Sequence, residues 1–264
     1  MNLSVRALET GYRRGEAVLR NVDLDCPAAS VTAIVGPNGC GKSTLLRCLA
    51  RLHRPWSGSV TLDGDDLWRM SPRKAARRVS FLGQSPQAPP GMSVAGLISL
   101  GRHPHRTLLH QWSNDDARAL DAALEATGMA EYADRPLAEL SGGQQQRAWI
   151  AMTICQEAPT LLADEPISAL DLGHAIDVMD LLRDMAAAGR TVVTVVHDLA
   201  MAARYADQVF ALDGGIPIAK GPPGTVITPQ VVGRLYGVDA EVLTVGPAST
   251  PVVVAKSRLK GDDS

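Results

Sequence analysis

The stretch Gly36-Pro37-Asn38-Gly39-Cys40-Gly41-Lys42-Ser43-Thr44 decides the fold of this chain. It follows a short apolar run, residues 31–35, that is typical of a buried strand, and it precedes leucines spaced for one face of a helix. A strand, a glycine-rich turn and a helix in this order are the context of a P-loop, whose backbone N–H groups surround an anion. The pattern therefore predicts that residues 36–44 cradle the phosphates of a nucleotide.

Two side chains of this turn carry the chemistry that a nucleoside triphosphate requires. Lys42 is a mobile cation suited to the β- and γ-phosphates, and Ser43 offers a hydroxyl oxygen to Mg²⁺. The helix that begins near Lys42 adds the positive end of its dipole. A glycine turn between two core elements is the alternative, but it leaves the complete pattern and both flanks unexplained. Taken alone, this stretch predicts only that a nucleoside triphosphate binds with Mg²⁺, as in a kinase, a GTPase or a motor; the motifs below favour ATP.

The composition indicates a globular chain that works in a reducing compartment. Its 264 residues, 45% of them hydrophobic, suit one domain with an inserted subdomain. The formal net charge of −2 creates no field that would attract nucleic acid or an acidic membrane surface. The four cysteines form no CxxC pair, so we expect reduced thiols. We recognise no signal peptide and no apolar run of about 20 residues that could span a membrane.

Buried strands alternate with helices along most of the chain. The apolar runs 79–82, 160–163 and 191–196 are typical of buried strands, and helices are expected over residues 141–156 and 171–188. This alternation predicts an α/β P-loop NTPase fold with a mostly parallel core sheet. In such sheets ligands bind at the carboxyl ends of the strands.

Two further parts differ from this core. Residues 2–8, 18–26 and 59–62 alternate apolar and polar side chains or end in a tight turn, which predicts an N-terminal antiparallel β subdomain. Helical patterns near residues 93–100 and 114–127 predict an inserted α-helical subdomain.

The whole chain, residues 1–264, is thus expected to form one domain. Residues 1–92 and 139–254 would form the core with its antiparallel part, and residues 93–138 the helical subdomain. The polar segment 255–264 is expected to be a mobile tail.

Five further motifs follow the P-loop in a fixed order. They are Gln84 at a strand end, Leu140-Ser141-Gly142-Gly143-Gln144, Asp164-Glu165-Pro166 at a strand end, Ser168-Ala169-Leu170-Asp171, and His197 after a buried strand. In this order, and along nearly its whole length, the chain resembles the ATP-binding subunits of ABC transporters.

The resemblance implies roles for the polar residues at the strand ends. Asp164 would hold Mg²⁺ together with Ser43, and Glu165 would be the general base for the attacking water. Glu165 could instead be a capping or salt-bridge carboxylate. His197 would contact the γ-phosphate, and Gln84 would bind Mg²⁺ or water and sense the transporter. A lone His or Gln at a strand end is more often a satisfied surface residue, so these two roles depend on the motif order.

The resemblance also implies how the nucleotide is enclosed. Tyr12 would stack on adenine, although a loop tyrosine can equally be a packing residue. Ser141-Gly142-Gly143-Gln144 would form a second anion site at a helix N-terminus. Since the chain already has one phosphate cradle, the family arrangement is an ATP-dependent head-to-tail homodimer, in which this segment closes over ATP held by the other subunit. Asp171 would lie near that interface. Cys40 would contribute mainly backbone, with a thiol open to alkylation near the nucleotide.

Three stretches resemble one group of importers within this family. Gly101-Arg102-His103-Pro104-His105 resembles a segment of the ATPases of iron–siderophore, haem and vitamin B12 importers, and residues 147–152 and 236–240 are similar too. We therefore expect import of an iron(III)-siderophore or related metal chelate, with haem, vitamin B12 or another substrate as alternatives. Residues 102–105 could also be a solvated basic loop, while two histidines alone are poor grounds for a metal site.

The implied partners are two transmembrane permease subunits and, through them, an extracytoplasmic substrate-binding protein. The chain would then lie at the cytoplasmic face of the cell membrane, with no nucleic acid as partner. A soluble ABC ATPase of DNA repair or translation is the alternative from another class, but such proteins usually carry coiled-coil or zinc insertions. A P-loop small-molecule kinase would not need residues 140–144.

Overall fold

The computed structural model describes residues 1–84, 86–106, 112–168, 170–246 and 249–259. Its centre is a six-stranded sheet in the order β10-β9-β3-β8-β7-β6. The strands are β3 (Val31–Val35), β6 (Val79–Leu82), β7 (Thr160–Asp164), β8 (Thr191–Val195), β9 (Gln208–Asp213) and β10 (Ile216–Gly221). Neighbours from β9 to β6 pair in parallel, and β10 pairs antiparallel with β9. The predicted α/β fold with a mostly parallel sheet is confirmed.

The register of this sheet brings the functional loops to one edge. Every residue of β3, β7 and β8 is buried, as expected for strands covered on both faces. Asp164 at the end of β7 lies opposite Val195 of β8, and Ile34 of β3 lies opposite the same valine. Because these strands are parallel, the loops that follow them meet at their shared carboxyl edge.

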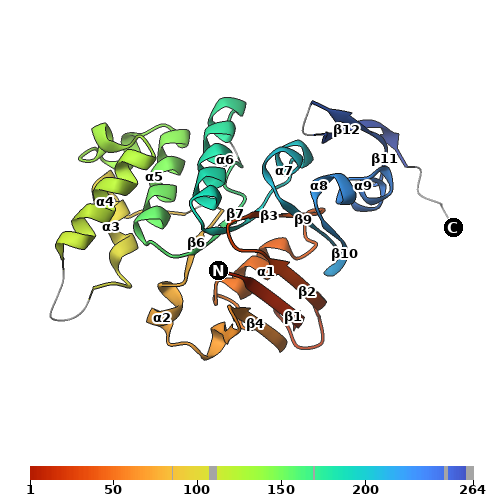
Figure 1. Cartoon of the computed structure of the whole chain (residues 1–264), viewed down its shortest axis with the longest axis horizontal. Coiled ribbons are helices and arrows are strands. Elements are labelled where there is room, and N and C mark those ends of the chain that lie inside the picture. Colours follow the sequence, from red (N-terminus) through yellow and green to blue (C-terminus); the bar gives the residue numbers. More distant parts are fainter. Residues whose placement is uncertain (85, 107–111, 169, 247–248, 260–264) are drawn as a thin grey trace.

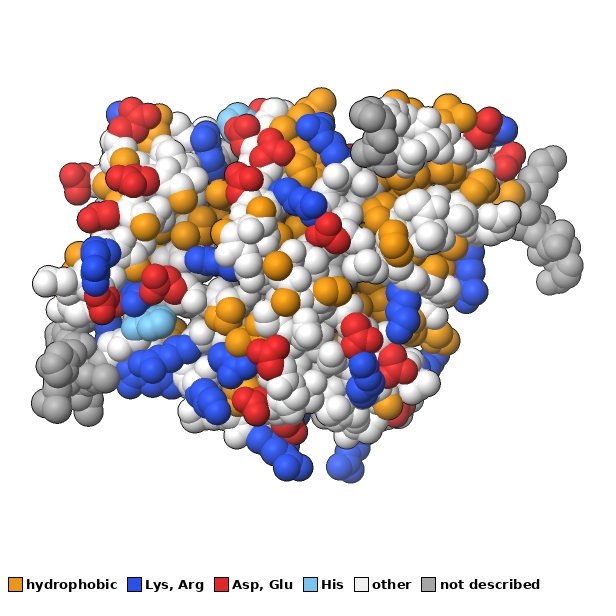
Figure 2. Space-filling view, viewed as in Figure 1, with side chains coloured by type: hydrophobic (Ala, Val, Ile, Leu, Met, Phe, Trp, Pro, Cys, Tyr) orange, Lys and Arg blue, Asp and Glu red, His pale blue; other side chains and the backbone are white. Residues whose placement is uncertain are grey.

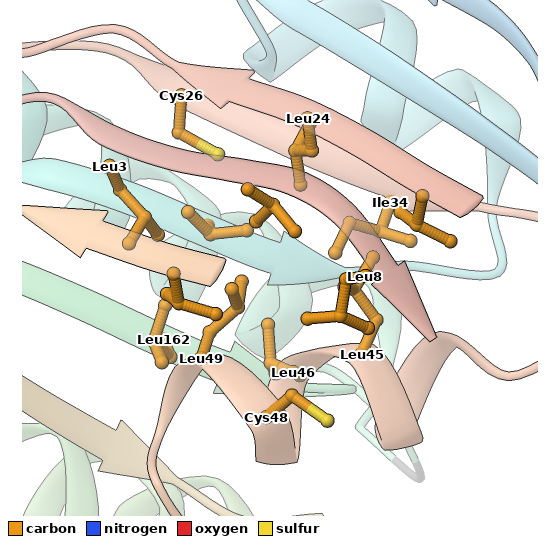
Figure 3. Packing of buried hydrophobic residues seen from close by; sticks show 14 of the residues in the cluster. Leu3, Leu8, Leu24, Cys26, Ile34, Leu45, Leu46, Cys48, Leu49 and Leu162 are labelled. Atoms are coloured by element: carbon orange, nitrogen blue, oxygen red, sulfur yellow. The ribbon is translucent and has the colours of Figure 1, made fainter. Parts of the chain in front are cut away.

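A second, antiparallel sheet packs beside the first (Figure 1). It has the order β2-β1-β4-β5 and consists of β1 (Leu3–Thr10), β2 (Leu19–Cys26), β4 (Ser57–Leu62) and β5 (Asp65–Asp66). Helix α1 (Lys42–Leu49) lies between the two sheets, and its leucines pack against Leu3 and Leu8 of β1 and against Leu162 of β7 (Figure 3). Burying one such leucine contributes roughly 2 kcal/mol, so this core holds α1, and with it the P-loop, firmly in place.

Helices cover the other face of the six-stranded sheet (Figure 1). α6 (Leu172–Ala187) and α7 (Leu199–Tyr205) pack on its centre in a second core cluster, with α8 (Pro223–Val226) and α9 (Pro229–Tyr236) towards the β9 side. The short helix α2 (Pro72–Ala76) precedes β6.

A third cluster of buried residues joins the helices of a lateral lobe. Here α3 (Val94–Ser99) and α4 (Asn114–Ala126) pack against α5 (Gly142–Cys155). The helices expected near residues 93–100, 114–127 and 141–156 thus form within a residue or two of their predicted ends. Because α5 leads directly into β7, this helix connects the lobe with the central sheet.

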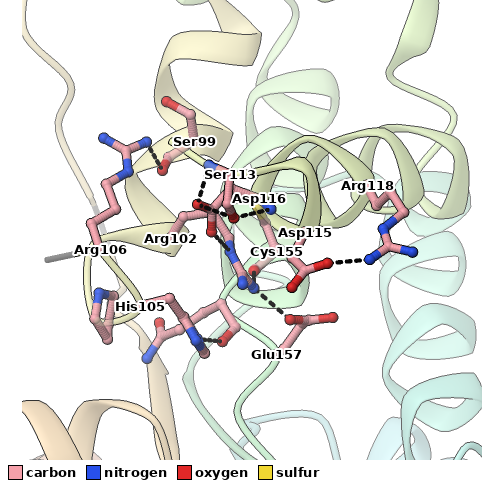
Figure 4. A network of polar contacts seen from close by, with 12 residues as sticks. Ser99, Arg102, His105, Arg106, Ser113, Asp115, Asp116, Arg118, Cys155 and Glu157 are labelled. Carbon is pink, nitrogen blue, oxygen red and sulfur yellow. Dashed lines mark hydrogen bonds and ion pairs between the residues drawn. The ribbon is translucent and has the colours of Figure 1, made fainter. Parts of the chain in front are cut away.

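The segment after α3 is an internal anchor of this lobe (Figure 4). Arg102 is only 3% exposed, and its guanidinium donates to Asp116 at 2.7 Å, to Glu157 at 2.5 Å and to the carbonyl of Cys155 at 2.9 Å. The alternative of a solvated basic loop is therefore wrong for Arg102, because two carboxylates and a carbonyl replace its water.

The C-terminal part contains a β-hairpin that the sequence did not suggest. β11 (Val238–Val245) pairs antiparallel with β12 (Thr250–Arg258). The expected mobile tail is therefore wrong for residues 255–258, because they pair with β11 and Lys256 bonds to Glu241 at 3.0 Å. Residues 260–264 of that tail lie outside the described part.

Two features of the described residues bear on a membrane: the length and polarity of the helices, and the charge of the surface. Among the described residues, no helix has both the length and the apolar character needed to cross a bilayer. Figure 2 shows acidic and basic side chains interspersed over the visible face, in keeping with the net charge of −2.

Candidate functional site

The P-loop joins β3 to α1 in a conformation that demands glycine at two points. Gly36 has φ +151°, and a Cβ atom there would overlap the carbonyl oxygen of Leu212 in β9. Gly41 has φ +104° and caps α1, where a Cβ atom would lie 2.7 Å from a methyl group of Leu19. The first N–H groups of α1 have no partner within the helix, so this end of the helix can bind an anion.

The ammonium group of Lys42 is hydrogen-bonded to the backbone of the P-loop itself. Lys42 is buried, and its Nζ donates to the carbonyl oxygens of Gly36 and Pro37, each at 2.8 Å. These neutral acceptors keep a buried ammonium group satisfied. A phosphate oxygen is a stronger, charged acceptor, so a nucleotide can draw Lys42 away from them.

Ser43 and Asp164 form a pair of oxygen ligands beside the loop. The hydroxyl of Ser43 donates to Oδ1 of Asp164 at 2.9 Å, and Asp164 is 2% exposed. Burial raises the pKa of this carboxyl group, while the bond from Ser43 opposes that shift. An alcohol and a carboxylate oxygen are the donors that Mg²⁺ prefers, so the pair fits the ion expected here. Over the described ranges, no cluster of three or more His, Cys, Asp or Glu side chains is arranged for a metal.

Glu165 lies at the centre of the polar side chains at the strand ends. Its Oε2 accepts from the side-chain amide of Gln84, and its Oε1 pairs with Nε2 of His197, both at 2.5 Å. Glu165 also has φ +51°, a left-handed conformation that a non-glycine residue adopts at a cost. The three residues follow β6, β7 and β8, and they lie close together because these strands are neighbours in the sheet. They form a proton-accepting group with two neighbours able to orient water.

One cavity of about 490 Å³ unites these parts, a volume suited to a small ligand. Its lining residues are Tyr12, Val18, Asn38, Gly39, Gly41, Lys42, Ser43, Thr44, Gln84, Glu165 and His197. The predicted site residues that do not line the cavity include Gly36, Pro37, Cys40 and Asp164. The carbonyl oxygens of Gly36 and Pro37 accept from Lys42, and the carboxylate of Asp164 accepts from Ser43. Most of the lining thus consists of residues singled out in the sequence, and Glu165, Gln84 and His197 lie together there.

The aromatic residue at the mouth of this cavity is open to a ligand. Tyr12 is 60% exposed, its hydroxyl lies 3.1 Å from Oγ1 of Thr44, and its ring lies 4.8 Å from the ring of His53. An exposed ring so placed can stack on a base. Val18, which lines the cavity, and His53, which contacts Tyr12, belong to no sequence motif; their only signal is their position beside β2 and after α1.

Cys40 is less reactive than expected. Its side chain is buried, and burial raises the pKa of its thiol, although Lys42 partly offsets this. Alkylation near the nucleotide is therefore disfavoured, because the thiolate is the reacting form.

The segment 140–144, called the signature segment below, does not line this cavity. Ser141 caps α5 in a capping box: its hydroxyl accepts from the N–H of Gln144 at 3.3 Å, and the Gln144 side chain accepts from the N–H of Ser141 at 3.0 Å. Ser141 and Gly142 are exposed. The chain thus has a second exposed helix N-terminus with glycines that is separate from its own phosphate cradle.

Comparisons with known proteins agree with this geometry. A family model described as ABC transporter matches residues 19–168. The chain is 40% identical to the achromobactin transport ATP-binding protein CbrD of Dickeya dadantii, over 98% of this chain and 96% of that one. It is 41% identical to the ferric enterobactin transport ATP-binding protein FepC of Escherichia coli, over 95% of this chain and 93% of that one. A solved structure of an inward-facing ABC transporter, described as of metal-chelate type, has a TM-score of 0.83 at 27% identity, with 96% of each chain covered.

Proposed function

Because this chain belongs to the ABC transporter ATP-binding family, we propose that it hydrolyses ATP to power import of an iron(III)-siderophore or a related metal chelate through a separate permease. The observation that carries the proposal is the cavity in which residues of the P-loop, Gln84, Glu165 and His197 meet. The class of substrate follows from CbrD and FepC, whose names specify achromobactin and ferric enterobactin transport.

The residues of the cavity have complementary roles towards ATP. Lys42 exchanges its two loop carbonyls for the β- and γ-phosphates, and Tyr12 stacks on the adenine. Glu165 accepts the proton of the attacking water. His197 and Gln84, both bonded to Glu165 in this structure, hold the water and the γ-phosphate in line. Each of these two carboxylate oxygens can accept a second hydrogen bond, so Glu165 can bind the water while both contacts remain.

The magnesium site would use the oxygen donors beside the P-loop. Ser43, Asp164 and Gln84 would hold Mg²⁺, and the ion would supply positive charge to offset that of the phosphates. The raised pKa of Asp164 reflects the cost of keeping a buried carboxylate there, and a cation offsets that cost.

The exposed signature segment supports a head-to-tail homodimer. It offers N–H groups at the start of α5 but lies outside its own chain's cavity, so it can serve a phosphate held by a second copy. Two copies related by a two-fold axis would then form two composite ATP sites. The dimer would work with two permease subunits at the cytoplasmic face of the membrane, supplied by an extracytoplasmic substrate-binding protein.

Uptake in a strain that lacks this gene tests the proposed substrate class. We expect loss of uptake of at least one radiolabelled ferric siderophore, with recovery on expression of the native chain and no recovery with Glu165→Gln. Haem and vitamin B12 uptake, measured in parallel, should be unchanged. If uptake of every ferric siderophore persists while that of haem or vitamin B12 is lost, the substrate assignment is wrong although the ATPase assignment stands.

A further inference from the structure

The imidazole of His174 lies directly against the signature segment. His174 is in the first turn of α6, and its side chain is 38% exposed. A methyl group placed on Gly143 would lie 2.5 Å from Cδ2 and 2.8 Å from Cγ of this ring. Gly143 does not have a positive φ, so its backbone would accept another residue. What excludes a side chain at position 143 is the ring of His174.

Asp171 fixes the orientation of this ring. Its Oδ1 accepts from the backbone N–H of His174 at 2.9 Å, and its Oδ2 lies 2.8 Å from Nδ1. These bonds lower the pKa of the Asp171 carboxyl group, so it is ionised and can only accept. Nδ1 therefore carries the hydrogen, and the ring is held by its own helix N-cap.

A second contact ties the same helix to the loop of the catalytic carboxylate. Nε2 of Gln146 donates to the carbonyl oxygen of Pro166 at 2.7 Å, and Pro166 directly follows Glu165. Gln146 is three residues beyond Gly143, so both lie on one face of α5. The start of α5 is thus attached, through His174 and Pro166, to the segment that carries Glu165.

We propose that His174 is a positioning residue, which holds the signature segment of one subunit in the place where it can close over ATP bound by the partner. The inference rests on the head-to-tail dimer proposed above. In that dimer, the segment beside each chain's own Glu165 would support the signature that serves the other site, so His174 would link the two ATP sites.

The two glycines of the signature segment provide a matched comparison. A methyl group on Gly142 meets nothing within 4 Å, whereas one on Gly143 meets His174. Both substitutions add one methyl group to the start of α5. The loss of dimer affinity caused by Gly143→Ala should depend on the residue at position 174, whereas the loss caused by Gly142→Ala should not.

The experiment is a double-mutant cycle on ATP-dependent dimerisation, measured by analytical ultracentrifugation with ATP and Mg²⁺ in a Glu165→Gln background. Gly143→Ala should weaken the dimer roughly tenfold or more when His174 is present, because it overpacks a filled contact. In the His174→Ala background, Gly143→Ala should weaken the dimer by no more than about threefold. The cost of Gly142→Ala should be equal in both backgrounds.

His174→Ala alone separates positioning from general stability. We expect severalfold weaker dimerisation, while the affinity of the single subunit for a fluorescent ATP analogue and the melting temperature remain unchanged. Equal costs of Gly143→Ala in the two backgrounds would overturn the proposal, as would a parallel fall in nucleotide affinity and melting temperature. If the Glu165→Gln parent binds ATP but forms no dimer, the proposed homodimer itself fails, which is a different result.

Discussion

At the scale of single residues, Asp164 shows a conflict between stability and function. Its carboxyl group is buried and its pKa is raised, so the folded state disfavours the ionised form. At neutral pH this ionisation lowers the stability of the fold, and the deficit disappears as the pH falls below the pKa of the unfolded chain. Such a cost is typical of a position kept for a ligand rather than for folding.

Asp164→Asn tests this conflict directly. The amide oxygen can still accept from Ser43, and the buried charge is gone, so the nucleotide-free variant should melt at the native temperature or above it. Its Mg²⁺-dependent ATPase rate should fall at least about a hundredfold, because an amide is a poor magnesium ligand. Calorimetry and a phosphate-release assay measure the two effects. A clear loss of stability without nucleotide would contradict this account of Asp164.

The sequence predicted site residues only where spacing carries the chemistry. Glycine positions and a lysine define the P-loop, and Asp164 with Glu165 follow a buried strand. Gln84 and His197 could be identified only from motif order. His174 was missed because Gly143, which it contacts, lies 31 positions earlier, and only the tertiary fold brings the start of α6 to the start of α5.

At the scale of elements, the buried ion pair of Arg102 and Asp116 organises the helical lobe. Burial alone would raise the pKa of Asp116, but bonds from Arg102 and Ser113 hold it at about 2. The carboxylate therefore stays ionised at any ordinary pH. Removing its partner leaves an uncompensated charge at the start of α4.

Arg102→Met and Arg118→Met form a matched pair that tests this anchor. Arg102→Met should lower the free energy of unfolding by about 3 kcal/mol, because it breaks a buried pair. Arg118 pairs with the neighbouring Asp115 on the exposed side of the same helix turn. Arg118→Met should therefore change the free energy of unfolding by less than about 1 kcal/mol. Urea denaturation measures both. Similar values for the two variants would show that the Arg102 network does not anchor the lobe.

The sequence pattern predicts some elements and not others, for a physical reason. The strands β3, β7 and β8 consist mainly of apolar residues and threonines, and their burial follows from that composition. The β11–β12 hairpin instead ends in polar residues, and contacts between its strands, such as the 3.0 Å ion pair of Lys256 with Glu241, stabilise it. Cross-strand pairing of this kind leaves little trace in the local pattern.

At the scale of the whole molecule, the two helix starts that we propose bind phosphate do not share a cavity in the described part of the chain. The P-loop begins α1 beneath the central sheet, and the signature segment begins α5 in the lobe (Figure 1). Gln146 and His174 fasten the second of these to the segment around Glu165. In a dimer with a second copy of the chain, the P-loop of each copy would face the signature segment of the other.

The mass of the Glu165→Gln variant in solution tests this central claim most directly. Light scattering during size-exclusion chromatography should give twice 27.9 kDa with ATP and Mg²⁺, because ATP persists when the general base is missing. With ADP, or with Lys42→Ala added, the mass should return to 27.9 kDa. A variant that binds ATP tightly and still elutes at 27.9 kDa would contradict the composite site.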